Sequence, residues 1–239
     1  MNDAPMVVHD PAYAKVATYS KYPTWAEVPA LPDQSLLDTI GAGTLENFYL
    51  VGEAWAHVLH RRLREGATVL DIGCGCGRTA RFLLFREDIR YIGFDIFQPA
   101  IEWCERYLVP FGGGRFRFAH FNAHSGHYNP RGTLSAREVR FPAEDASIDV
   151  AFAASLFTHL LEADAVHYLR ESARALKPGG ILVASVHCEP APGSKYSGRE
   201  NRIEVDRAHF LSMASAAGLV LAEDLGSLCG QEALVFKRP

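Results

Sequence analysis

Three glycines at alternate positions constrain this chain more than any other feature. They follow a short apolar run that ends in an acid, in the stretch Val69-Leu70-Asp71-Ile72-Gly73-Cys74-Gly75-Cys76-Gly77-Arg78. The apolar run has the character of a β-strand, and the segment after it is typical of a helix. Glycines at such a turn let the main chain approach a ligand closely, because no Cβ stands in the way. The stretch predicts the first strand, turn and helix of a nucleotide-binding half-domain, with Asp71 facing the crevice at the carboxyl end of the sheet.

Length and composition favour one substantial domain. The chain has 239 residues, of which 48% are hydrophobic and 22% charged, as is ordinary for a globular protein with a buried core. The formal net charge of -4 does not indicate the positively charged surface that binds nucleic acid, so we expect no nucleic-acid partner. There is neither a signal-like N-terminus nor a long apolar run, and we expect a cytoplasmic protein without a membrane span.

The cysteines and other ligating residues give no sign of a metal site. Five cysteines are an odd number, which does not suggest a disulfide framework. Cys74 and Cys76 are closer in sequence than zinc ligands usually are, and His124 and His127 lack a third ligand. We therefore expect no bound metal.

The rest of the chain alternates strand-like and helix-like segments. An irregular arm is expected over 1–45, with the Lys21-Tyr22-Pro23 turn as a candidate lid, and one domain over 46–239. Strands are expected at 69–72, 91–94, 115–121, 148–154, 181–186, 219–224 and 233–236. Helices are expected at 45–63, 79–85, 100–108, 163–176 and 206–217, with a turn at Lys177–Gly180. This order predicts an α/β fold: a parallel sheet with helices on both faces and an antiparallel hairpin at its C-terminal end.

The glycine spacing distinguishes between nucleotide-binding families. A dinucleotide fingerprint requires Gly-x-Gly-x-x-Gly, and Arg78 stands where its third glycine should be. The pattern Asp71-x-Gly73-x-Gly75-x-Gly77 instead resembles motif I of the class I S-adenosylmethionine-dependent methyltransferases. Segments 91–95, 140–154 and 175–180 agree with that family in order and spacing. The resemblance runs from about residue 45 to the C-terminus, and it implies a seven-stranded, Rossmann-like, doubly wound sheet and S-adenosyl-L-methionine as the cofactor.

The resemblance also implies roles for individual residues. Gly73 and Gly75 would pass under the methionine part of the cofactor, and Asp71 would reach its amino group directly or through water. Asp95 would accept hydrogen bonds from both ribose hydroxyls. Asn122 stands where many family members have an acid that contacts the adenine, and its amide can still bond the adenine edge. The other expected cofactor-binding residues are Gly77, Ile96, Ala123, Ser155 and Arg78, the last either at the cofactor carboxylate or exposed on the helix.

Methyl transfer to a hydroxyl requires alignment with the methyl group and a base near the hydroxyl proton. The topology places such a base after the fourth or fifth strand, which makes His159 the first catalytic candidate and His187 the second, although either could be only structural. Two irregular segments, 124–139 and 189–205, could shape the acceptor site or be plain surface loops.

We therefore expect methyl transfer from S-adenosylmethionine to a hydroxyl of a small molecule or of a sugar or glycan. One alternative is N-methylation of a small amine, and another is a non-catalytic S-adenosylmethionine-binding domain. The sequence indicates neither the identity of the acceptor nor the oligomeric state.

Overall fold

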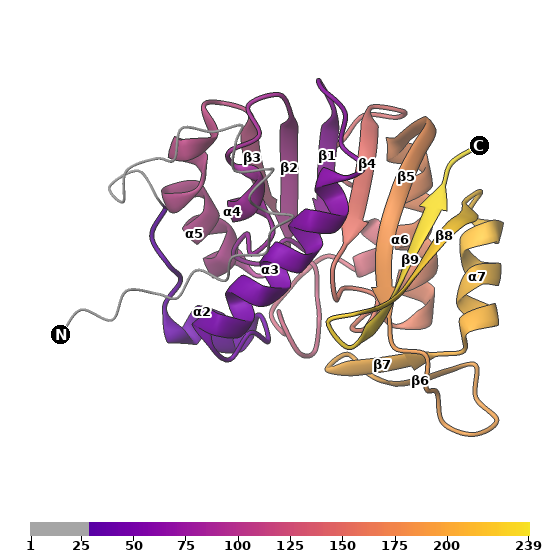
Figure 1. Ribbon diagram of the computed structural model, residues 1–239. Helices are drawn as coiled ribbons and strands as arrows, with labels where there is room; N and C mark the ends of the chain where they lie inside the picture. Colours follow the sequence, from indigo (N-terminus) through magenta and orange to yellow (C-terminus); the bar gives the residue numbers. More distant parts are fainter. Residues whose placement is uncertain (1–28) are drawn as a thin grey trace.

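A seven-stranded sheet forms the centre of the computed structural model, which describes residues 29–239 (Figure 1). The strand order is β3-β2-β1-β4-β5-β9-β8. The first five strands are parallel, whereas β9 is antiparallel to both β5 and β8. The predicted fold, a mostly parallel sheet with an antiparallel C-terminal hairpin, is confirmed. The candidate lid turn at residues 21–23 lies outside the described residues.

The predicted strands and helices correspond to observed ones, with small shifts at their ends. The strands of the sheet are β1 (Thr68–Ile72), β2 (Arg90–Asp95), β3 (Phe116–His120), β4 (Ile148–Ala153), β5 (Leu176–Val186), β8 (Val220–Leu228) and β9 (Gln231–Lys237). The helices are α2 (Gln34–Thr39), α3 (Leu45–His60), α4 (Ala80–Leu83), α5 (Gln98–Tyr107), α6 (Glu162–Ala175) and α7 (Arg207–Ala216).

Alternation along the strands produces two apolar layers, one on each face of the sheet. Val69 of β1 belongs to the core cluster under α3, α4 and α5, whereas its neighbours Leu70 and Ile72 belong to the cluster under α6 and α7 (Figure 1). This follows from the two-residue period of a strand. On the first face Trp55 stacks on Phe152 with ring centroids 6.3 Å apart. The sheet is therefore doubly wound, as expected.

Three segments differ from the sequence-based expectation. The end of the expected irregular arm contains a short helix, α2, whose N-cap Asp33 accepts a hydrogen bond from the amide of Leu36. Lys177–Gly180 lies inside β5, as an irregular stretch where the register with β4 shifts, because the backbone resumes pairing on both sides of it. The expected loop 189–205 contains a hairpin of β6 (Tyr196–Arg199) and β7 (Arg202–Val205).

The topology opens a crevice where the carboxyl ends of β1 and β4 diverge. β1 lies between β2 and β4. The chain therefore leaves β1 and β4 toward opposite sides of the sheet, and ligands bind at such switch points. The β6–β7 hairpin lies below the lower end of β5 in Figure 1. Among the described residues, no helix has both the length and the apolar character needed to cross a membrane.

Candidate active site

The glycine loop after β1 forms the floor of the crevice. Gly73, Gly75 and Gly77 have φ angles of +77°, +51° and +71°, a region that side chains with a Cβ rarely adopt. The amides of Gly73 and Cys74 both donate to the carbonyl of Phe94, at 2.9 and 3.0 Å, which fastens the loop to the end of β2. Gly73 and Gly75 line the main cavity of the molecule, whereas Gly77 packs against α5 and is not among the lining residues.

Asp95, at the end of β2, faces this loop. Its Oδ2 accepts a hydrogen bond from the amide of Gly75 at 2.7 Å, and its Oδ1 accepts one from Phe97 at 2.9 Å. Burial raises the pKa of the Asp95 carboxyl, although the backbone hydrogen bonds partly oppose the shift. Asp95 and Ile96 both line the cavity, so each is placed to contact a ligand lying on the glycine loop.

Arg78 points into the cavity instead of lying exposed on the helix. It is half-buried and among the lining residues, and burial lowers the pKa of its guanidinium. Within residues 29–239 no carboxylate forms an ion pair with it. A buried cation without a partner is costly, so this position is suited to a ligand that carries a negative charge.

Asp71 lies beneath the loop and does not line the cavity. Its side chain is buried, and its carboxyl accepts a hydrogen bond from the hydroxyl of Tyr91. Desolvation raises the pKa of Asp71 to about 8, while the Tyr91 hydrogen bond opposes the shift. In this conformation Asp71 reaches a ligand only through an intermediate group or a rearrangement.

The cavity extends from the glycine loop to the insert after β3 and to helix α6. Its free volume, including open solvent at the mouth, is about 1070 Å³. Thr39, the last residue of α2, and Ile40 after it contribute to the lining, and Ile40 lies above Gly75. The far wall carries the polar side chains of Tyr128, His159, Asp164 and Tyr168.

The His159 imidazole is held in one tautomer. Its Nδ1 lies 2.8 Å from the carbonyl oxygen of Glu200, and a carbonyl can only accept, so Nδ1 carries the proton. In the neutral ring Nε2 is then an acceptor, and it lies 3.3 Å from the hydroxyl of Tyr128. Burial lowers the pKa of His159, which keeps the ring neutral. Nε2 therefore has the lone pair and the position of a general base facing the cavity.

Glu200, at the tip of the β6–β7 hairpin, also orders the insert after β3. Its carboxylate accepts hydrogen bonds from the Ser125 hydroxyl at 2.7 Å and from the His127 amide at 3.1 Å. The amide of Tyr128 donates to the same Ser125 hydroxyl, at 3.1 Å. Both segments expected to shape the acceptor site are thus joined at Glu200, beside His159.

Comparisons with known proteins agree with this geometry. Residues 70–182 match the family model described as a methyltransferase domain. The chain therefore contains a methyltransferase domain. S-adenosylmethionine is the cofactor of such domains.

Two curated relatives have informative names. One is named after a small-molecule acceptor, and the other is named as an O-methyltransferase. The 27-O-demethylrifamycin SV methyltransferase of Amycolatopsis mediterranei is 31% identical over 121 residues, which cover 50% of this chain and 38% of that enzyme. An O-methyltransferase of Aspergillus nomiae is 28% identical over 178 residues, which cover 68% of this chain and 72% of that enzyme. The chain therefore spans only about two fifths of the first relative's length.

A solved structure supports the fold. The 1,6-didemethyltoxoflavin-N1-methyltransferase of Burkholderia thailandensis, solved with its acceptor and S-adenosylhomocysteine, superposes with a TM-score of 0.61 at 19% identity. The match covers 99% of this chain and 93% of that one. It shows that residues 29–239 share their fold with a solved methyltransferase.

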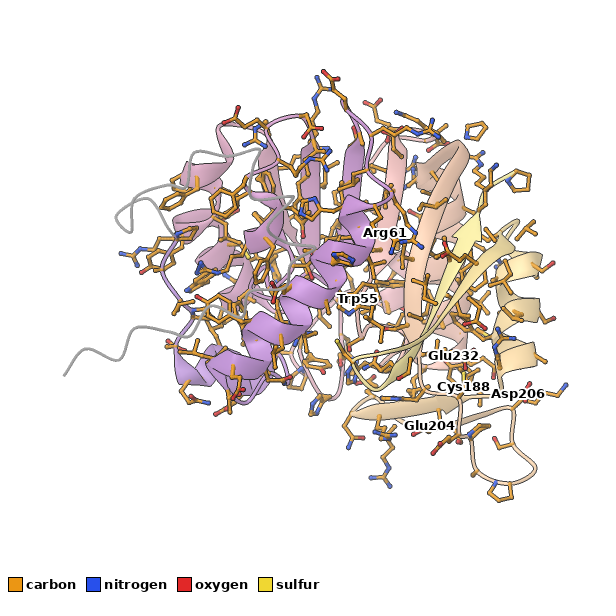
Figure 2. All side chains as sticks on the ribbon, in the orientation of Figure 1. Trp55, Arg61, Cys188, Glu204, Asp206 and Glu232 are labelled. Atoms are coloured by element: carbon orange, nitrogen blue, oxygen red, sulfur yellow. The ribbon has the colours of Figure 1, made fainter. Side chains whose placement is uncertain are left out.

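Besides Asp71 and Gly77, two further residues expected at the site do not line the cavity. Asn122 is exposed, and its amide bonds Thr133 and Asn129 within the insert, at 3.2 and 3.1 Å. Its neighbour Ala123 lines the cavity, because successive residues point to opposite sides. His187 lines a separate cavity at the end of β5, together with Cys188, Glu204 and Glu232, which Figure 2 labels near the small hairpin.

Several residues of the site were not candidates at the sequence level. Asp164 and Tyr168 are four residues apart on α6 and so share one helix face, a signal that was available. Tyr128 and Glu200 come from irregular segments whose conformation no local pattern predicts. Within the described part of the chain, no cluster of three or more histidine, cysteine or acidic side chains could hold a metal ion.

Proposed function

We propose that this methyltransferase moves the methyl group of S-adenosylmethionine to a hydroxyl of a small molecule. The observation that carries the proposal is the His159 Nε2 lone pair. This lone pair faces the cavity whose floor is the glycine loop. The Glu200 carbonyl oxygen lies 2.8 Å from Nδ1 and so fixes the tautomer of the ring.

The residues of the cavity fit the cofactor. A Cβ at Gly73 would lie 2.9 Å from Leu156 Cδ1, so the close packing of Leu156 on the loop favours glycine at this position, and the loop backbone would carry the methionine part. The Asp95 carboxylate keeps lone pairs for the ribose hydroxyls beyond the two amides it accepts. Arg78 supplies a positive charge for the cofactor carboxylate. Asp71 would act on the amino group through water.

Residues of the chain then remove the proton of the acceptor hydroxyl. The bound cofactor supplies an electrophilic methyl group. His159 Nε2 accepts the proton of the acceptor hydroxyl as its oxygen becomes nucleophilic, and the Glu200 carbonyl stabilises the resulting imidazolium through Nδ1–H. The Tyr128 hydroxyl, released from Nε2, can donate to the acceptor oxygen and orient it. Leu156 and Leu160 help to keep water out.

The names of the relatives support oxygen as the methylated atom and a small molecule as the acceptor. A glycan acceptor and methylation at nitrogen stay open, since the Burkholderia thailandensis protein is named as an N1-methyltransferase. The absence of a nucleic-acid partner and a cytoplasmic location stay predictions from the sequence.

We further propose that residues 46–239 form the catalytic domain and that the end of the preceding arm, at Thr39 and Ile40, borders the cofactor. Support comes from Thr39 and Ile40, which lie at the end of that arm and line the cavity beside Gly75. The insert and the β6–β7 hairpin would close the opposite side, because Glu200 joins them there.

A transfer assay tests the proposal. The protein is incubated with S-adenosylmethionine carrying a 13C-methyl group and a panel of phenols, alcohols and amines, and the labelled atom is located by NMR. We expect label on oxygen, with a loss of at least about 100-fold in His159→Gln, since general-base catalysis contributes about that much or more. His57→Gln on α3 is the control and should keep its activity. Label on nitrogen alone, or equal activity of His159→Gln, would contradict the proposal.

A further inference from the structure

Ser155 stands at the switch point of the sheet in a strained conformation. It is the second residue after β4 and has a φ of +57°, in the left-handed region where non-glycine residues are uncommon. Such strain persists where the surroundings require it, often at functional sites. Ser155 also lines the cavity above the glycine loop.

A closed set of hydrogen bonds holds Ser155 in this conformation. Its amide donates to the Ser185 hydroxyl at 2.9 Å, and its carbonyl accepts from the Thr158 hydroxyl at 2.9 Å. Its own hydroxyl oxygen lies 2.6 Å from Gln231 Nε2. Gln231 comes from the start of β9, so the C-terminal hairpin reaches across β5 to the carboxyl end of β4.

The buried Ser185 hydroxyl determines the direction of these bonds. Ser185 is fully buried, and its hydroxyl oxygen lies 2.6 Å from Gln231 Oε1. Its proton must therefore be donated to that oxygen, because a buried hydroxyl without an acceptor is costly. If the Gln231 amide were flipped, Ser185 would face an NH2 group and lose this acceptor. The amide orientation is thereby fixed, with Nε2 donating to Ser155.

One hydrogen atom remains unassigned in this network. Among residues 29–239, the Ser155 amide, carbonyl and hydroxyl oxygen all have partners, and the hydroxyl proton has none. Gln231 Nε2 can only donate, so the Ser155 proton cannot be directed toward it. The proton is left to point into the cavity that Ser155 lines, as a fixed donor for a ligand.

The neighbours of Ser155 indicate which part of a ligand it meets. The next residue, Leu156, packs against Gly73, where the methionine part of the cofactor would lie. Arg78, which follows the glycine loop, lines the same cavity, and within residues 29–239 no carboxylate forms an ion pair with it. The Ser155 hydroxyl and the Arg78 guanidinium therefore both belong to the part of the cavity that borders the glycine loop.

We propose that the Ser155 hydroxyl donates a hydrogen bond to the carboxylate of bound S-adenosylmethionine, and that Gln231 is the residue that positions this hydroxyl. This inference rests on the proposed function. It assigns to the C-terminal hairpin, which is remote from the glycine loop in sequence, a part in recognising the cofactor.

Calorimetry with two ligands tests the inference. S-adenosylhomocysteine carries the carboxylate, and its decarboxylated analogue keeps the amino group, the ribose and the adenine. The wild type should prefer S-adenosylhomocysteine. Ser155→Ala and Ser155→Gly should bind it about tenfold more weakly, or about 1.4 kcal/mol, and bind the decarboxylated analogue within about twofold of wild type. Gln231→Leu should change the preference in the same direction by a smaller factor, since the hydroxyl remains but can rotate.

Controls separate the possible failures. Ser155→Gly relieves the positive φ, so it stays folded even if Ser155→Ala does not, and thermal melting verifies each variant. Ser215→Ala on the exposed face of α7 and Gln98→Leu on α5 should leave both affinities unchanged. If the Ser155 variants bind S-adenosylhomocysteine as the wild type does, or weaken both ligands equally, the inference is wrong while the proposed function stands. If the wild type binds neither ligand, the proposed function fails as well.

Discussion

The backbone amide of Gly75 and the carboxylate of Asp95 lie 2.7 Å apart, which joins the glycine loop to the end of β2. The same carboxylate is the group that the account assigns to the ribose. Asp95→Asn keeps an oxygen for one partner but loses the charge, so we expect the affinity for S-adenosylhomocysteine to fall about tenfold or more. The rise in melting temperature on adding the ligand measures this. Asp38→Asn, at an exposed site on α2, should show the wild-type rise, and so should Asp95→Asn if Asp95 has no part in binding.

The protonation state of His159 can be tested without knowing the methyl-accepting substrate. Because burial lowers the pKa of His159, the ring should stay neutral below the ordinary histidine value of about 6.5. Nitrogen-detected NMR should show the Nδ1–H tautomer, with the signal assigned by its absence in His159→Gln. An Nε2–H tautomer, or titration at or above pH 6.5, would remove His159 from the role of base.

Asp71 should make stability fall as pH rises. Its pKa is about 8 in the folded protein, against about 3.9 in an unfolded chain. The folded state thus holds a proton that the unfolded state releases, so the stabilising contribution is complete below about pH 4 and is lost as pH rises to about 8. Between pH 5 and pH 8.5, Asp71→Asn should gain on the order of 4 kcal/mol relative to wild type in urea unfolding. A constant difference between the two proteins would show that Asp71 is ionised throughout.

Gly77 and Gly66 form a matched pair for a test of the loop. Their φ angles are +71° and +76°, but a Cβ at Gly77 would lie 2.2 Å from Leu108 Cδ1, whereas one at Gly66 would meet nothing within 4 Å. Gly66→Ala carries only the backbone strain, about 1 kcal/mol. Gly77→Ala also forces α5 away from the loop, so we expect a loss of about 3 kcal/mol in urea unfolding. Equal losses would mean that α5 adjusts without cost.

The sheet could be predicted from the sequence because its signals are local. The glycine loop and the alternation of apolar strands with helices predict the strands β1 to β5 along the chain. The short link after residue 224 predicts the antiparallel hairpin. The small β6–β7 hairpin could not be predicted in this way. Tyr196–Arg199 lacks a two-residue apolar period, and the alternation in Arg202–Val205 is only four residues long. The position of the hairpin depends on long-range bonds such as the Ile203 amide to the Thr158 carbonyl, at 2.7 Å.

The site was predicted best where a single strand end determines the position. Asp95 is the last residue of β2, Ala123 and His159 follow β3 and β4, and all three line the cavity. His187 follows β5 in the same way, but the C-terminal hairpin and β7 enclose it in a separate cavity. Glu200 contacts His159, which is 41 positions away in the sequence, and Gln231 contacts Ser155, which is 76 positions away. No sequence period predicts such pairs.

Titration of the purified protein with S-adenosylhomocysteine, followed by calorimetry, tests most directly whether the cavity over the glycine loop is a cofactor site. The account predicts saturable binding of one ligand per chain, weakened by Asp95→Asn. If the folded wild type takes up no ligand, the assignment of the cavity to S-adenosylmethionine is contradicted.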